Sequence, residues 1–140
     1  MTLAYFDTNA FVKLLVQEPG SDVAAAVWTG ADAVATSPLA SPELRGALAA
    51  GRRRGDLSAQ ALSRAVLEWS GLWTSLRVVP LSVAVTAPSG ELAEDHVLTG
   101  ADAVHLSSAL ALSQEVLFVT WDQRLARAAR AEGLTVVPAL

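Results

Sequence analysis

The chain has 140 residues, a length that suits one domain covering residues 1–140, and its content of 52% hydrophobic and 17% charged residues excludes a disordered protein. It contains no cysteine, which excludes disulfides, thiolate metal sites and a cysteine nucleophile. The net charge of -4 excludes an overall basic surface for nucleic acid, so any such contact has to come from a local basic patch or from metal ions.

Short apolar runs, each typical of a buried strand, alternate along the chain with longer segments of helical periodicity. The predicted strands are Leu3–Phe6, Ala33–Thr36, Arg77–Leu81, Val116–Thr120 and Thr135–Val137. The predicted helices cover roughly residues 8–17, 21–28, 41–54, 58–76, 89–96, 100–113 and 122–132. Strands separated by helices pair in parallel through right-handed crossovers. The sequence therefore predicts a three-layer α/β fold, with a central, mainly parallel sheet of about four to five strands flanked by helices.

Two prolines help to place the helix boundaries. The run Ser41, Pro42, Glu43 predicts a helix start, with Ser41 as the capping residue and the proline in the first turn. Pro88 interrupts a later segment, so we place the start of that helix after it, at about Ser89.

The apolar segments are too short for a membrane. None approaches the about 20 residues that a membrane span needs. The N-terminus reaches Asp7 with no basic residue before it, unlike a secretory signal peptide. We therefore expect a cytoplasmic protein without membrane contact.

Four acidic residues fall near helix starts, three of them just after predicted strands. Asp7 directly follows the first strand, Glu43 lies a few residues past the second, Asp122 follows the fourth, and Asp102 opens a helix. Taken singly, Asp102 and Asp122 are typical helix caps and Glu43 is a first-turn acid that stabilises its helix. Asp7 fits a purely structural role least well, because an apolar strand leads it to a buried edge of the sheet.

Together the four acids point to a metal site. Ligands of open parallel sheets bind beyond the carboxyl ends of the strands, where these carboxylates would converge and repel one another. The single lysine, Lys13, lies elsewhere, whereas Mg²⁺ and Mn²⁺ prefer oxygen ligands. Phosphodiester hydrolysis uses all-carboxylate sites with one or two such ions. The pattern predicts metal-dependent phosphodiester hydrolysis that needs no histidine base.

Four segments of the chain resemble PIN-domain ribonucleases: YFDTNAFVKLL, SPELRGAL, GADAVHLSSAL and FVTWDQRLARAARAEGL. They occur in the family's order with similar spacing, over essentially the whole chain, and are most similar to the VapC type, the toxin half of bacterial toxin–antitoxin pairs. The resemblance implies a PIN-like fold and a Mg²⁺- or Mn²⁺-dependent endoribonuclease that cuts structured RNA such as tRNA or rRNA. It also implies inhibition by a cognate VapB-type antitoxin, and a homodimer.

The resemblance also implies roles for individual residues. The catalytic and metal-binding positions of the family match four acids: Asp7, Glu43, Asp102 and Asp122. Small polar residues beside them are expected to orient ligands or water: Thr8, Asn9 and Thr120. The chain departs from the family at Pro42, where an aliphatic residue is commoner, and around Pro88, where the family has a smoother helix. Neither departure removes an acidic position.

Other residues are open to a structural or a functional interpretation. For His105, one turn after Asp102, packing at a helix–sheet boundary is favoured over a place in the site, and His96 is expected to face solvent. Trp69 and Trp73 share an apolar helix face and are expected in the core. A solvated helix surface or a contact with RNA or antitoxin explains four basic residues equally well: Arg45, Arg52, Arg53 and Arg54.

Several other functions were weighed against these residues. A receiver-type domain needs adjacent acids after the first strand, and a haloacid-dehalogenase-type phosphatase needs an aspartate where Asn9 stands. Both also need a lysine that is missing. Two alternatives stay open: a PIN nuclease of RNA processing rather than a toxin, and a PIN-like domain that binds RNA or a partner without cutting. The full acidic set argues against the second, because four repelling acids make little sense without a metal.

Overall fold

The computed structural model describes residues 1–139, and within them a five-stranded sheet in which all neighbouring strands are parallel. The order is β3-β2-β1-β4-β5, which places β1 at the centre. The strands are β1 Leu3–Phe6, β2 Ala33–Thr36, β3 Arg77–Val78, β4 Val116–Val119 and β5 Thr135–Val137. The predicted parallel sheet is confirmed. Its third strand is shorter than expected, because Pro80 has no N–H to donate to the ladder.

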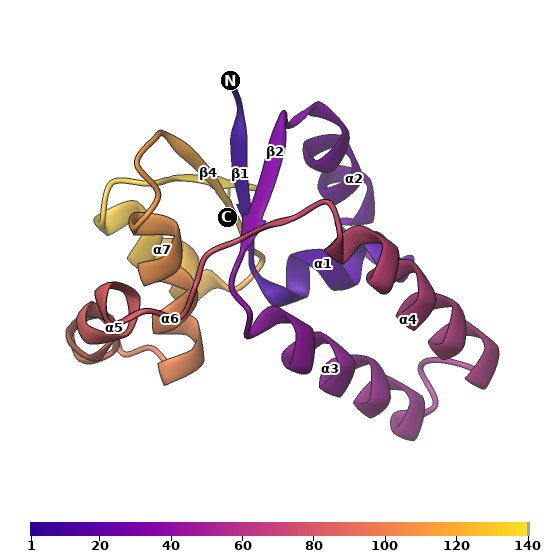
Figure 1. Ribbon diagram of the computed structural model, residues 1–140. Coiled ribbons are helices and arrows are strands. Elements are labelled where there is room, and N and C mark those ends of the chain that lie inside the picture. Colours follow the sequence, from indigo (N-terminus) through magenta and orange to yellow (C-terminus); the bar gives the residue numbers. More distant parts are fainter. Residues whose placement is uncertain (140) are drawn as a thin grey trace.

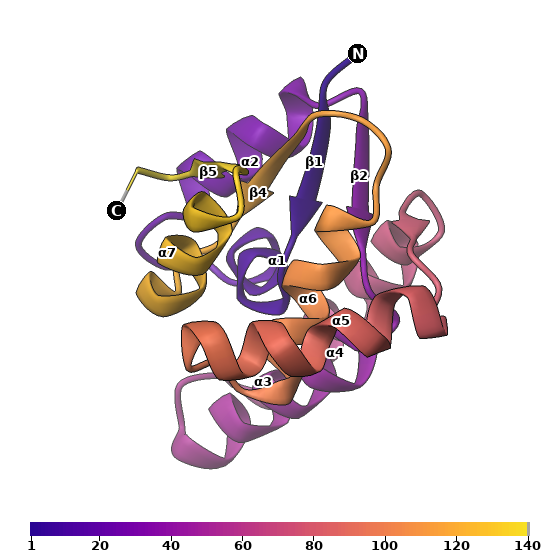
Figure 2. The same cartoon turned by 90° about the vertical axis from the view of Figure 1, so that its left-hand side faces the viewer.

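Helices cover both faces of the sheet, which gives the predicted three layers (Figures 1 and 2). The helices are α1 Thr8–Leu15, α2 Ser21–Gly30, α3 Ala40–Arg54, α4 Ala59–Trp73, α5 Val83–His96, α6 Gly100–Leu110 and α7 Gln123–Ala131. Successive side chains of β1 point to opposite faces of the sheet and enter two separate core clusters. Leu3 and Tyr5 pack with α5–α7, whereas Ala4 and Phe6 pack with α1, α3 and α4. No helix within residues 1–139 is long and apolar enough to cross a membrane.

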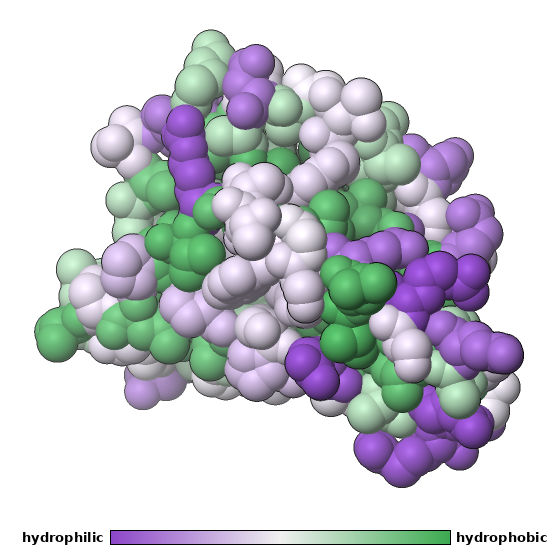
Figure 3. Space-filling model, turned by 45° about the vertical axis from the view of Figure 1, so that its right-hand side comes forward, coloured by the Kyte–Doolittle hydropathy of each residue, from purple (hydrophilic) through white to green (hydrophobic). Residues whose placement is uncertain are grey.

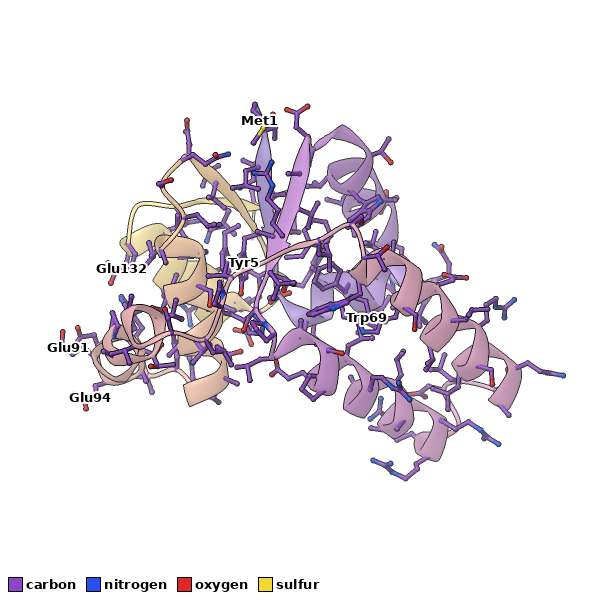
Figure 4. All side chains as sticks on the ribbon, viewed as in Figure 1. Met1, Tyr5, Trp69, Glu91, Glu94 and Glu132 are labelled. Atoms are coloured by element: carbon purple, nitrogen blue, oxygen red, sulfur yellow. The ribbon has the colours of Figure 1, made fainter. Side chains whose placement is uncertain are left out.

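Helices α3 and α4 form a hairpin that projects from the body of the protein (Figure 1). Trp69 points from α4 into its base, where it is 3% exposed and meets Phe11 edge-on at 4.9 Å (Figure 4). The core position predicted for Trp69 is therefore confirmed, while Trp73 is only partly buried. The last turn of α3, at the far end of the hairpin, carries the exposed Arg52–Arg54, and hydrophilic side chains gather at this end (Figure 3).

Helix α3 begins slightly earlier than the sequence suggests. It starts at Ala40, so the prediction that Ser41 caps it was wrong. The hydroxyl of Ser37 instead accepts the N–H of Leu39 at 3.1 Å in the turn before the helix. Pro42 then lies within the first turn, where its missing N–H removes no intrahelical bond.

Helix α5 contains Pro88, so the prediction that this helix starts after the proline was also wrong. An internal proline costs roughly 3 kcal/mol in helix stability. Packing on α6 compensates, because Val85 and Leu92 are buried and the Ser107 hydroxyl of α6 donates to the Val85 carbonyl at 2.7 Å.

Candidate active site

The four acids predicted from the sequence line one pocket of about 140 Å³ at the carboxyl edge of the sheet. Asp7 joins β1 to α1, Asp122 joins β4 to α7, and the other two lie in the first turns of α3 and α6. The pocket is completed by four further residues: Thr8, Asn9, Ala47 and His105. The fold therefore brings together groups from 115 residues of chain, while their catalytic and metal-binding roles stay predictions.

Asp7 is the most buried of the four carboxylates, at 4% exposure. Its Oδ1 accepts the N–H of Ala10 at 2.9 Å, which caps α1, and its Oδ2 accepts the Thr120 hydroxyl at 2.5 Å. Burial raises the pKa of Asp7 to about 6, although the bonds from Thr120 and Ala10 favour the ionised form. Because burial disfavours the ionised form of Asp7, a nearby cation would stabilise that form.

Thr120 links two of the acids. Its hydroxyl donates to Asp7 and also accepts the N–H of Asp122 at 3.1 Å. Asp122 in turn caps α7 by accepting the N–H of Leu125 at 2.9 Å, as its position in the sequence suggested. The orienting role predicted for Thr120 agrees with this geometry.

Asp102 does not cap its helix, contrary to the structural interpretation of its position. Thr99 is the cap, because its hydroxyl accepts the N–H of Asp102 at 3.2 Å. Burial, followed by the charge of Asp122, raises the pKa of Asp102. Since α6 is capped without it, the Asp102 carboxylate is not needed to start the helix.

Glu43 is held by a chain of hydrogen bonds that reaches the core. Its Oε1 accepts the Thr8 hydroxyl at 2.8 Å and lies 2.7 Å from Nε2 of His105. Because a carboxylate only accepts, Nε2 carries the proton, and in the neutral ring Nδ1 accepts the Tyr5 hydroxyl at 2.8 Å. Burial alone would raise the pKa of Glu43, but the bonds from His105 and Thr8 outweigh it and lower the pKa.

His105 thus combines the two interpretations that the sequence left open. It is 2% exposed and packs edge-on against Tyr5 of β1, as expected at a helix–sheet boundary (Figure 4 labels Tyr5). It also lines the pocket through its bond to Glu43. Sequence spacing gave no sign of the second contact, because 62 residues separate the two side chains.

Replacing His105 by alanine is expected to lower the free energy of unfolding by about 3 kcal/mol, measured by urea denaturation. The substitution opens a cavity and leaves the buried Tyr5 hydroxyl without its partner. His96→Ala is the matched control and should cost less than about 1 kcal/mol, because His96 only pairs with Glu132 near the surface. Equal losses in the two variants would contradict the network.

The remaining predicted residues lie at different distances from the pocket. Asn9 is exposed and lines it. Arg45 is exposed on α3 outside the lining, and Arg52–Arg54 lie nine to eleven residues beyond Glu43, about 14 to 17 Å along the helix. His96 does not face solvent as predicted, since its side chain is 20% exposed and its Nε2 lies 3.1 Å from Glu132.

The donor set of the pocket suits a hard divalent cation, because every acid in it offers oxygen. Burial is the main reason why the pKa values of Asp7 and Asp102 are raised, so a cation would favour the ionised form of both acids. Within residues 1–139, however, no group of three His, Asp or Glu side chains is drawn together tightly enough to be a preformed metal centre. The residues fit a cation by chemistry, and binding requires their side chains to close around it.

The sequence model of the PIN domain matches residues 4–131. The chain belongs to the PIN-domain family. Ribonuclease VapC49 of Mycobacterium tuberculosis (strain ATCC 25618 / H37Rv) is 49% identical to this PIN domain over 140 residues, which is 99% of this chain and 97% of that protein. The predicted resemblance to PIN-domain ribonucleases of the VapC type is confirmed. Ribonucleases of this family generally need a divalent metal ion.

Two solved structures share the fold of this PIN domain. PAE2754 from Pyrobaculum aerophilum superposes with a TM-score of 0.71 at 20% identity, covering 97% of this chain and 84% of that one. VapBC2 from Rickettsia felis, bound to a DNA fragment from their promoter, gives 0.63 at 18% identity, with 96% and 97% covered. The predicted three-layer PIN fold is confirmed.

Proposed function

We propose that this PIN domain is an endoribonuclease toxin that cuts structured RNA, such as tRNA or rRNA, with Mg²⁺ or Mn²⁺ as its cofactor. The observation that carries the proposal is the convergence of Asp7, Glu43, Asp102 and Asp122 on one pocket. Its relationship to Ribonuclease VapC49 supports the ribonuclease class. We expect a nuclease of this kind to act in the cytoplasm, where its RNA substrate is found.

The four carboxylates would hold the cation. When bound, the ion supplies charge neutralisation at the phosphate and activation of water. Asp7 and Asp122 are fixed for this task because each already caps a helix, and the Thr120 hydroxyl connects them. His105 and Thr8 both engage Oε1 of Glu43, which leaves its Oε2 as the oxygen without these partners. These contacts restrict the orientation of the ligands, which would draw closer together when the ion binds.

A cognate VapB-type antitoxin is the proposed partner. A toxin needs an inhibitor, and the structural neighbour VapBC2 is described as a complex bound to promoter DNA. An acidic pocket attracts a cation, so we expect an arginine or lysine of the antitoxin to enter it. A homodimer, expected from the family resemblance, belongs to the same proposal.

The proposal is tested by incubating total cellular RNA with purified, antitoxin-free protein in Mg²⁺, in Mn²⁺ and in EDTA. Discrete fragments are expected only with metal. Metal at about 100 times its dissociation constant should also stabilise the fold by about 2.7 kcal/mol, which a thermal shift detects.

Two outcomes would contradict it. Identical fragments in EDTA would rule out a metal-dependent nuclease. Metal binding without cleavage of any RNA, by protein shown to be folded, would favour a PIN-like domain that only binds.

A further inference from the structure

A basic hollow of about 440 Å³ lies beside the acidic pocket and has no part in the site described above. It is formed between the end of α5 and one side of α7, which lie side by side in Figures 1 and 2. Its lining residues are His96, Val97, Arg124, Arg127, Ala128 and Ala131. We propose that this hollow binds a backbone phosphate of the RNA next to the phosphate that is cut, an inference that rests on the proposed function.

The two cavities share their supporting elements. Asp122 caps α7 and lines the acidic pocket, whereas Arg124 and Arg127 follow on the same helix and line the basic hollow. At 1.5 Å rise per residue, the two arginines lie about 3 and 7.5 Å beyond Asp122 along the helix axis. Both arginines therefore lie within about two helical turns of Asp122, so a strand that places one phosphate at the acidic pocket can place a neighbouring phosphate at the hollow.

The chemistry of the hollow fits a phosphate. Arg124 is held in place because its Nη1 donates to the carbonyl of Val97 at 3.2 Å. Arg127 makes neither a hydrogen bond nor an ion pair with any residue of 1–139, so its guanidinium can form the two parallel bonds that phosphate accepts. Because Ala128 and Ala131 have small side chains, they leave space for a phosphate in the hollow.

None of the residues that line the hollow is acidic. The nearby carboxylate of Glu132 lies 3.1 Å from Nε2 of His96 and pairs with it rather than with an arginine of the hollow. Figure 4 labels Glu132 on this side of the molecule. By contrast, Arg54 on the α3–α4 hairpin already has Asp56 at 3.0 Å. A chain of net charge -4 that presents an acidic pocket to RNA needs such a local cationic contact to hold the strand.

Arg127→Gln tests the proposal, and Arg130→Gln is its matched control. Both residues are exposed arginines of α7, but only Arg127 lines the hollow. Binding of a short fluorescein-labelled single-stranded RNA is measured by anisotropy in EDTA, where no metal-dependent cutting occurs. Arg127→Gln is expected to weaken binding about 10-fold and to reduce the salt slope by about 0.7, whereas Arg130→Gln stays within about twofold of the unmodified protein.

Kinetics separate this role from a general effect on the enzyme. With RNA that the protein cuts, Arg127→Gln should raise KM about 10-fold and leave kcat within about twofold, with an unchanged unfolding midpoint. Unchanged RNA affinity of Arg127→Gln would overturn the inference, even if antitoxin binding fell, and so would an equal loss in Arg130→Gln. A protein that binds RNA through Arg127 but cuts none would overturn the proposed nuclease and leave the phosphate site standing.

Discussion

Asp7→Asn is expected to reduce metal-dependent RNA cleavage by about 10³-fold or more, equivalent to about 4 kcal/mol of transition-state stabilisation. The amide keeps an oxygen that can accept the N–H of Ala10, so the cap of α1 survives. The substitution removes the negative charge of the most buried carboxylate in the pocket. Initial rates with Mg²⁺ or Mn²⁺ measure the loss.

The same substitution should make the protein more stable. An acid whose pKa is raised from 3.8 to about 6 in the folded state favours folding most when protonated, and this contribution is lost as pH rises from about 4 through about 6. Above that range, ionised Asp7 costs about 3 kcal/mol, which asparagine avoids. Urea denaturation in EDTA should therefore show a larger gain for Asp7→Asn at about pH 8 than at about pH 5.

Asp32→Asn is the control for both measurements. Asp32 accepts the N–H of Thr2 at 2.6 Å just before β2, at the opposite edge of the sheet. It should leave cleavage unchanged and should not make the protein more stable. Wild-type cleavage by Asp7→Asn would overturn the assignment of the site.

Asp102→Asn should also abolish cleavage, with a loss of about 10³-fold or more, and should weaken Mn²⁺ binding measured by calorimetry. Its carboxylate, with a pKa raised by burial and by the charge of Asp122, is one that a cation would stabilise. Because Thr99 caps α6, the fold should be retained.

Asp22→Asn provides the comparison, since Asp22 is an exposed acid in the first turn of α2, away from the pocket. It should leave cleavage and Mn²⁺ affinity unchanged. Undiminished Mn²⁺ affinity in Asp102→Asn would remove Asp102 from the set of metal ligands.

The sequence predicted those features that depend on local order along the chain. Each of the first four strands is followed by a helix, so parallel pairing could be predicted from the alternation, and Asp7 and Asp122 could be placed at strand ends. The first residues of the helices were harder to predict. Ser41 lost the capping position to a turn organised by Ser37, and Pro88 stayed inside α5 because packing on α6 outweighed its local cost.

Contacts between distant segments escaped prediction for a different reason. The bond between His105 and Glu43 depends on how α6 faces α3 across the end of the sheet, which periodicity does not encode. The basic hollow brings Arg127 of α7 next to His96 and Val97 at the end of α5. Only the folded structure shows that these two helices are neighbours. The arginine run at 52–54 stood out in the sequence because it was contiguous, yet it lies at the far end of a hairpin.

All four acids of the pocket lie at the N-terminal end of a helix, as caps of α1 and α7 or in the first turns of α3 and α6. Each such end carries roughly half a positive charge from the aligned peptide dipoles. The four ends together offset roughly two of the four negative charges of the carboxylates. What is left equals the charge of one divalent ion, so under the proposed function we expect the pocket to bind a single metal ion at rest and a second ion only together with the phosphate charge of the RNA.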